Sequence, residues 1–254
     1  MKGGGGLASW KKRLTAGALA LLLLVSTAVT CRLWEAPEAD REVMGDARIP
    51  AGPYVALTFD DGPRQSTTPI LLDGLAQRGV HATFFVIGEN VEGNELLLQR
   101  IEGEGHQVGL HTYHHKSLAE LNAADFYAEV DSLRETLTAL LGRESFMLRP
   151  PYGMISTAGM ARAAAPIILW SVDPEDWSDR YTARQVAVIV DKAQDGDIIL
   201  LHDIYPASVD TALQVVDALM AKGFHFVTVE ELFAIRGIAP DNGTVYRKLP
   251  PSSG

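Results

Sequence analysis

The chain has almost no cysteine: Cys31 is the only one among its 254 residues. No intramolecular disulfide can form, so a folded domain must be held together by hydrophobic packing or by a metal. Hydrophobic residues make up 47% of the chain, which is ample for one sizeable core.

Positive charge is also scarce. The formal net charge is −10, and Lys2, Lys11, Lys12 and Arg13 all precede the first acidic residue, so the remainder is more acidic still. Binding to a nucleic-acid backbone needs clustered lysines and arginines. The acidic balance therefore argues against nucleic acid as a partner.

The sequence lacks an apolar run of the length that spans a bilayer comfortably, which is about 20 residues. A shorter run at 19–25 (LALLLLV) follows the four basic residues and precedes the small residues at 26–28. This order is typical of an export signal. We expect residues 1–30 to be a signal peptide, with an uncleaved membrane anchor as the alternative; lipidation at Cys31 is more weakly supported. The protein is then secreted or anchored at the cell surface, outside the cytoplasm.

Residues 31–52 are charged and aperiodic and are predicted to be a linker. From Pro53 onward, strand-like runs alternate with amphipathic helical runs. We predict seven strands, at 54–59, 82–88, 107–111, 146–149, 166–172, 197–202 and 224–229. We predict helices between Pro69 and Gly79 and at 94–105, 123–141, 183–194, 209–222 and 230–236.

This alternation predicts an α/β fold with a parallel sheet, either closed into a barrel or open and doubly wound. No Gly-x-Gly-x-x-Gly follows the first predicted strand, so the fingerprint of a dinucleotide site is missing. The domain is expected to occupy residues 53–238. The polar, Pro- and Gly-rich stretch at 239–254 is predicted to be a disordered tail.

Unusual polar residues collect at the carboxyl ends of the predicted strands, which is the rim that carries the active site in α/β barrels. They are Asp60, Asp61, His111, Arg149, Asp173, Asp176 and His202. Each has a structural explanation when taken alone, such as a helix cap, a salt bridge or a buried histidine. Chance would scatter polar groups over both ends of the strands, so their convergence favours chemistry.

The stretch HTYHH (111–115) offers imidazoles four apart, His111 and His115, or three apart, His111 and His114. With a carboxylate from Asp60 or Asp61, either pair makes a two-His, one-Asp site with open positions. That pattern is typical of a catalytic rather than a structural zinc.

Five blocks occur in order: TFDD (58–61), HTYHH (111–115), RPPY (149–152), DPEDW (173–177) and LLH (200–202). Together they closely resemble the motifs of the polysaccharide deacetylases of carbohydrate esterase family 4, over residues 53–236. Within that family, the chain looks most like the catalytic domain of peptidoglycan N-acetylglucosamine deacetylases.

The resemblance implies a distorted (β/α) barrel with about seven parallel strands. It also implies a role for each motif residue: Asp60 as general base, Asp61, His111 and His115 as metal ligands, Arg149 as the partner of Asp60, Tyr152 as an oxyanion donor through its backbone N–H, His202 as general acid, Asp176 as the residue that tunes His202, and Trp177 and Leu200 as walls of the acetyl pocket. His114 is left as a bystander.

The implied function is that of a metal-dependent hydrolase, with Zn²⁺ as the expected ion. Metal-activated water would remove N-acetyl groups from a cell-wall polysaccharide, most simply peptidoglycan. Chitin oligomers, acetylated xylan and small amides are alternative substrates. A surface carbohydrate-binding protein with a structural metal is a non-enzymatic alternative, but it requires a fourth protein ligand. We expect a monomer whose partner is the glycan polymer.

Overall fold

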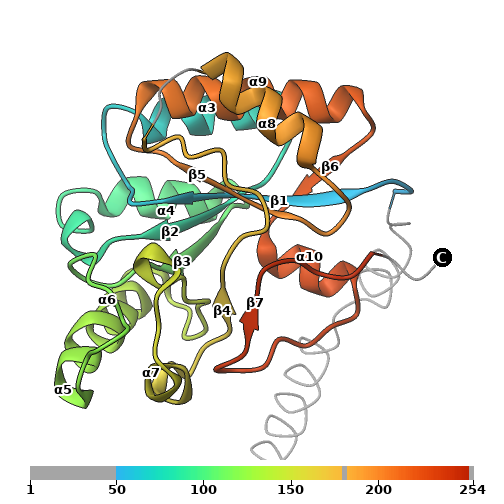
Figure 1. Ribbon diagram of the computed structural model, residues 1–254. Coiled ribbons are helices and arrows are strands. Elements are labelled where there is room, and N and C mark those ends of the chain that lie inside the picture. The colour runs from blue at the N-terminus through green and yellow to red at the C-terminus, as the bar shows by residue number, and fades with distance from the viewer. Residues whose placement is uncertain (1–49, 179–181, 252–254) are drawn as a thin grey trace, which may run out of the picture. The chain divides into compact units, whose positions relative to one another are not determined.

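Figure 1 shows the computed structural model, which describes residues 50–178 and 182–251. The predicted signal or anchor at 1–30 and residues 31–49 of the predicted linker lie outside these ranges. In the described part of the chain, no helix is both long and apolar enough to cross a bilayer.

The central sheet is parallel, with β1 (Tyr54–Asp60) in its middle. The strand order is β3 (Gln107–Leu110), β2 (Thr83–Val86), β1 and β5 (Ile198–His202), and β6 (His225–Val227) pairs with the first residues of β1. All seven residues of β1 are buried. A parallel strand covered on both faces carries an almost continuous apolar run, as YVALTF does.

The side of the barrel between β3 and β5 is much less regular. Here β4 (Ile167–Ile168) pairs in parallel with β7 (Val245–Tyr246). Only isolated parallel bridges connect this pair to the sheet: Leu110 to Leu148, Leu148 to Ile167, and Val172 to Ile199. The molecule is a distorted barrel in which ladders form one part of the wall and single bridges the other.

Two of the predicted strands differ from the structure. The segment 146–149 forms only the bridges at Leu148, because Pro150 and Pro151 follow at once and lack the N–H needed to extend a ladder. The segment 166–172 contributes only the two residues of β4 and an isolated bridge at Val172.

The helices surround the barrel. They are α3 (Thr68–Arg78), α4 (Glu95–Gly103), α5 (Ala123–Phe126), α6 (Ser132–Leu141), α7 (Thr157–Arg162), α8 (Thr182–Lys192), α9 (Pro206–Ala221) and α10 (Val229–Ile235), with short 3₁₀ turns η1 (Gly88–Asn90) and η3 (Pro151–Gly153). In Figure 1, α3, α8 and α9 lie together over one side of the sheet.

Three helical details differ from the sequence predictions. The predicted helix at 123–141 is found, but a π turn, η2 (Tyr127–Asp131), joins α5 to α6. α9 begins earlier than predicted, with Pro206 in its first turn. The unpredicted α7 is capped by Ser156, whose side chain accepts a hydrogen bond from the Gly159 N–H.

The prediction of a disordered tail is wrong for residues 239–251. This segment returns to the barrel, where β7 pairs in parallel with β4 and the side chain of Leu249 is buried. The backbone of Leu249 donates a hydrogen bond to the Gly196 carbonyl at 2.9 Å. Polar and Pro-rich composition misled the prediction, because only a few apolar side chains are needed to dock such a segment. Residues 252–254 lie outside the described ranges.

The core consists of two clusters that the alternation of β1 separates. The odd-numbered residues of β1, which are Val55, Leu57 and Phe59, point outward and pack against residues of the covering helices. Its even-numbered residues face the barrel interior: Tyr54 and Ala56 pack in a cluster that includes Phe85 and α10 residues. Thr58 and Asp60 continue this inner face, so β1 directs Asp60 into the top of the barrel.

Candidate active site

Asp60 and Asp61 both face the top of the barrel, although adjacent residues of a strand normally point to opposite faces. Asp60 is the last residue of β1 and follows the inward alternation. Asp61 has left its strand and adopts a left-handed backbone with φ 74°. Aspartate tolerates this conformation better than most residues. The end of the strand therefore allows two consecutive carboxylates to serve one site.

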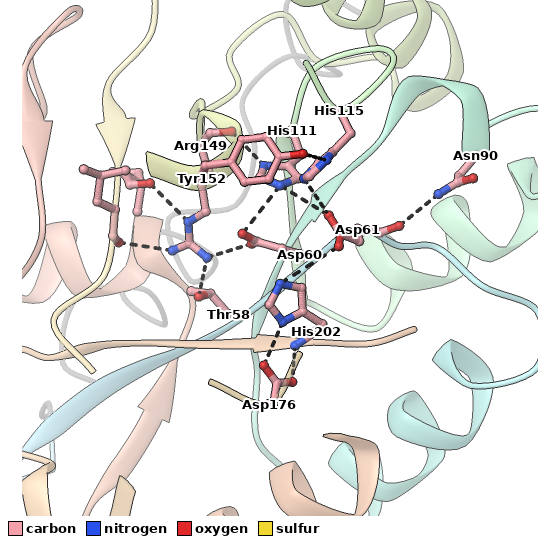
Figure 2. Close-up of polar contacts among 12 residues, drawn as sticks. Thr58, Asp60, Asp61, Asn90, His111, His115, Arg149, Tyr152, Asp176 and His202 are labelled. Carbon is pink, nitrogen blue, oxygen red and sulfur yellow. Dashed lines mark hydrogen bonds and ion pairs between the residues drawn. The ribbon is translucent and has the colours of Figure 1, made fainter. Parts of the chain in front are cut away.

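Asp61, His111 and His115 form a three-residue group with its ligand atoms within 4.8 Å of one another. Nε2 of His111 lies 3.4 Å and Nε2 of His115 lies 3.3 Å from Oδ1 of Asp61. Figure 2 shows both imidazoles converging on this carboxylate, while the Asp61 carbonyl oxygen accepts a bond from the Asn90 amide at 2.9 Å.

The donor set fits a divalent metal. Nδ1 of His111 lies 2.8 Å from the Arg149 carbonyl oxygen, to which it must donate, so Nε2 of a neutral His111 presents a lone pair to Asp61. Oδ1 of Asp61 is buried and has no hydrogen-bond partner. Lone pairs that converge without a proton between them are satisfied by a cation, and the 2-His, 1-carboxylate set with open positions is that of a catalytic site.

The shifts in the pKa values of Asp61 and His115 also favour metal binding. Burial raises the pKa of Asp61, but the neighbouring imidazoles of His111, His202 and His115 together lower it below its ordinary value. Burial lowers the pKa of His115. An ionised carboxylate and a neutral imidazole are the forms that bind a metal.

Arg149 is fully buried and holds Asp60 in place. Its Nη1 donates to Oδ1 of Asp60 at 2.8 Å and to the Thr58 hydroxyl at 2.7 Å, and its Nε and Nη2 donate to the carbonyls of Ile168 and Leu169. The guanidinium also lies 4.1 Å from the centre of the Phe85 ring. Oδ2 of Asp60 is left on the side of His111, at 3.7 Å from its Nε2.

His202 ends β5 and is fixed by Asp176 at two points. Nδ1 of His202 lies 2.7 Å from Oδ1 of Asp176, and the His202 backbone N–H donates to Oδ2 at 2.9 Å. Burial lowers the pKa of His202, but the Asp176 hydrogen bond and the charges of Asp176, Asp60 and Asp61 together raise it to about 9. The protonated imidazole is therefore favoured in the folded chain near neutral pH, with Nε2 4.0 Å from Oδ2 of Asp61.

These groups line one cleft of about 360 Å³. Its walls are Asp60, Asp61, His111, His115, Tyr152, Trp170, Asp173, Trp177, Leu200 and His202. The side chains of Tyr152 and Trp177 are more than half exposed at its mouth, whereas Leu200 is buried in its wall. The structure thus brings together all ten residues to which the resemblance assigned a role, with Arg149 and Asp176 directly behind the lining.

His114 turns away from this cleft, which decides between the two histidine pairs left open by the sequence. Its Nδ1 lies 3.0 Å from Oε1 of Glu129, and its backbone N–H donates to Oε2 at 2.8 Å. Lys116 also reaches Glu129, at 3.0 Å. Glu129 itself is buried in the π turn and ties down the loop that carries His115.

Sequence reasoning missed four residues that shape the site: Thr58, Asn90, Glu129 and Trp170. Thr58 had a usable signal, because it stands two residues before Asp60 and so shares its face of the strand. The contacts of Asn90 and Glu129 depend on the reach of side chains between elements, for which the sequence has no local pattern.

Backbone strain concentrates in the loops of this rim. Among the described residues, six other than glycine have positive φ: Asp61, Thr112, His115, Tyr152, Glu175 and Ala164. All but Ala164 belong to the motif segments around the cleft. Such conformations cost about 1–3 kcal/mol each, and they cluster at sites where function fixes the direction of a side chain.

Known proteins resemble this chain in sequence and in fold. The polysaccharide deacetylase family model matches residues 47–165. Peptidoglycan-N-acetylmuramic acid deacetylase PdaC of Bacillus subtilis is 37% identical over 182 residues, which cover 72% of this chain and 39% of PdaC. This chain therefore spans about two fifths of the length of that relative.

Two further relatives are covered over most of their length. A peptidoglycan-N-acetylglucosamine deacetylase of Bacillus cereus is 37% identical, over 72% of this chain and 70% of the relative. A family 4 acetyl xylan esterase from Clostridium thermocellum, solved in complex with a cobalt ion, has a TM-score of 0.74 and 27% identity over 78% of this chain and 99% of that one. From its sequence and its fold, the chain belongs to the polysaccharide deacetylase family.

Proposed function

We propose that the chain is a metal-dependent hydrolase that removes N-acetyl groups from N-acetylglucosamine units of a cell-wall polysaccharide, and that this polymer is peptidoglycan. One observation carries the proposal: a three-ligand metal group shares a cleft with a carboxylate held by Arg149 and a histidine held by Asp176. A base, an acid and a Lewis-acid site within one cleft are the groups that amide hydrolysis needs.

Asp61, His111 and His115 would hold the metal. Their nitrogen and oxygen donors suit Zn²⁺, and cobalt also accepts such a set. When bound, the metal would polarise the acetyl carbonyl and lower the pKa of a water molecule in the cleft. In the described residues this is the one group of three or more potential ligands, which supports an open catalytic site over a closed structural one.

Asp60 is the proposed general base. Arg149 occupies Oδ1, so Oδ2 is the oxygen left to take a proton from the attacking water. The buried Arg149 side chain has five donors to place and is fixed by four hydrogen bonds, which prevents Asp60 from rotating toward its neighbour.

His202 is the proposed general acid. Asp176 binds its Nδ1 and so leaves Nε2 to carry a proton into the cleft. A glucosamine nitrogen cannot depart as an anion, so it must receive a proton as the C–N bond breaks. The hydrogen bond and charge of Asp176 raise the pKa of His202, which favours the protonated form until the departing amine accepts the proton.

The remaining walls would orient the acetyl group. Trp170, Trp177 and Leu200 offer apolar surface for its methyl carbon. Tyr152 lies over His115, with its hydroxyl 3.3 Å from Nδ1, and we assign its backbone N–H to the developing oxyanion.

The choice of polymer rests on other grounds. The three relatives above are named for N-acetylmuramic acid, N-acetylglucosamine and acetyl xylan, so family membership leaves the sugar open. The export-type N-terminus favours a polymer outside the cytoplasm, and the names of the two Bacillus relatives favour peptidoglycan.

Acetate release by the purified chain tests the proposal. N-acetylglucosamine oligomers, peptidoglycan and acetylated xylan would be compared before chelation, after chelation and after Zn²⁺ is restored. We expect acetate from the N-acetylated polymers, loss of release on chelation and recovery with Zn²⁺. No acetate from the metal-loaded chain on peptidoglycan or the oligomers, or full activity after complete metal removal, would refute it.

A further inference from the structure

A second cleft, of about 250 Å³, adjoins the first on the far side of the metal group. Its lining residues are Asp61, Pro63, Arg64, Ile87, Asn90, His115 and Ile204. Asp61 and His115 line both clefts, and Figure 2 shows Asn90 on the opposite side of Asp61 from Tyr152. A sugar chain with its reacting unit in the first cleft can therefore extend into the second.

Among the residues that the structure describes, Arg64 is the only arginine or lysine that lines either cleft. Its Nη1 donates to the carbonyl of Ile204, another lining residue, at 3.1 Å, which fixes one end of the guanidinium at the wall of the cleft. Within the described residues this is the only hydrogen bond of the side chain, and no carboxylate pairs with it. By contrast, six other described arginines have acidic partners: Arg78, Arg100, Arg134, Arg143, Arg149 and Arg236.

The backbone of Arg64 is also fixed in place. Its N–H donates to the Thr68 hydroxyl at 2.8 Å, its carbonyl accepts from the N–H groups of Thr67 and Thr68, and the Thr68 hydroxyl in turn donates to the buried Asp203. The loop after β5 thus holds the Arg64 side chain through Ile204, and the segment after β1 holds its backbone through Thr67 and Thr68. A cation fixed before the ligand arrives loses less entropy on binding.

The charged residues that line the two clefts indicate which kind of ligand Arg64 can bind. Asp60, Asp61 and Asp173 line them, and the whole chain is strongly acidic. Arg149 and His202 face Asp60 and Asp61, whereas no carboxylate among the described residues pairs with Arg64, so Arg64 is the cation of these clefts that can pair with an incoming carboxylate. The Nε–Nη2 edge of a guanidinium matches the two oxygens of a carboxylate.

We propose that the second cleft is a subsite for a sugar unit bearing a carboxylate, and that Arg64 binds that carboxylate. This inference rests on the proposed function, since it names the neighbour of the reacting sugar. In peptidoglycan that neighbour is N-acetylmuramic acid, whose carboxylates belong either to its lactyl ether or to an attached peptide. Chitin and xylan backbones offer neither, so Arg64 selects peptidoglycan over them.

Binding measured apart from turnover tests the subsite. The Zn²⁺-loaded full chain, with Asp60→Asn to prevent hydrolysis, would be titrated calorimetrically with three probes: the N-acetylglucosamine–N-acetylmuramic acid disaccharide, the same disaccharide with its peptide, and the neutral N-acetylglucosamine dimer. Arg64→Gln would be compared with Arg162→Gln, a control on the exposed end of α7 that lines neither cleft.

We expect at least one carboxylated probe to bind roughly fivefold more tightly than the neutral dimer, as for an exposed ion pair. This preference should weaken as salt is raised. It should disappear in Arg64→Gln and persist in Arg162→Gln. Preference for the peptide-free disaccharide assigns the lactyl carboxylate, and preference for the peptide-bearing probe alone assigns the peptide.

Equal affinity for all three probes in the Asp60→Asn chain, or a preference that survives Arg64→Gln, would overturn the subsite. Acetate release from the same probes by the wild-type chain is measured separately. A binding preference without acetate would retain the subsite and reject the proposed reaction, whereas acetate without a preference would do the reverse.

Discussion

Asp60 and Asp61 are neighbours in sequence and in space, yet their contacts differ. Asp60 is bonded to a buried guanidinium, while Oδ1 of Asp61 has no hydrogen-bond partner and faces two imidazoles. The first arrangement suits the proposed general base, and the second suits the proposed metal ligand. Adjacent residues of one type thus acquire separate tasks from the side chains around them.

Two substitutions separate these tasks. Asp60→Asn should lower kcat by about 10²–10⁴-fold, the usual contribution of a general base, while Zn²⁺ still binds. His115→Ala should weaken Zn²⁺ binding itself, since it removes a ligand. Acetate assays and competition with a chromophoric chelator measure the two effects. Lost metal in Asp60→Asn with retained metal in His115→Ala would reverse the assignment.

Asp176→Asn should change the titration of His202. In the metal-free wild type, the His202 ring should titrate near pH 9, and in the variant it should titrate at a clearly lower pH, because the hydrogen bond and charge of Asp176 that raise its pKa are gone while burial, which lowers the pKa, remains. NMR of labelled histidines measures this. An unchanged His202 titration would mean that Asp176 does not tune it.

The same shift makes stability depend on pH. The pKa of His202 is raised on folding, so its stabilising contribution is complete below about pH 6.5 and is lost as pH rises through about 9. The Tm of the metal-free wild type should therefore fall toward that of Asp176→Asn over this range. A difference in Tm between the two that widens with rising pH would contradict this sign.

At the scale of elements, the π turn η2 is an unusual feature with a visible effect. One wider turn inside the helical run places Glu129 under the loop 111–116, where its carboxylate binds the His114 N–H and Lys116. Such turns are rare and occur often at functional sites. The turn η2 thus supports the loop 111–116, which carries two of the proposed metal ligands, without providing a ligand itself.

Glu129→Gln should weaken Zn²⁺ binding by roughly tenfold, the lower range for residues that support metal ligands, because the loop carrying His115 loses an anionic anchor. Chelator competition on the full chain measures the affinity. Glu135→Gln is the matched control, since Glu135 lies on α6 and bonds the exposed Tyr127 hydroxyl. Equal affinity in all three proteins would show that the loop holds its shape without Glu129.

The elements also show how far the sequence could be interpreted. Buried strands such as β1 were predictable, since a run of six apolar or half-apolar residues followed by Asp60 has few alternatives. The rim was predictable because parallel strands bring their carboxyl ends together, which gathers Asp61, His111 and His202 from distant positions. Segment 146–149 and strand β7 were not predictable, because whether so short a segment forms a strand or a single bridge depends on the backbone of the neighbouring segment rather than on its own residues.

At the scale of the whole molecule, the C-terminal segment closes the barrel wall at β4. Leu249→Ala should therefore lower the free energy of unfolding by about 2–5 kcal/mol, as for other buried leucines. Denaturant unfolding measures it, with Arg247→Ala as the control because Arg247 is exposed. Equal stability of both variants would restore the disordered-tail prediction.

The pairing of β4 with β7 also has a consequence for biosynthesis. Ribosomes make the chain from its N-terminus. The backbone of Ile167 and Ile168 therefore cannot pair with β7 until Val245 and Tyr246 have been synthesised. Contacts of such long sequence separation form late and slow folding. A nascent chain stalled before β7 would present an open strand edge, the surface through which incomplete chains aggregate and which chaperones recognise.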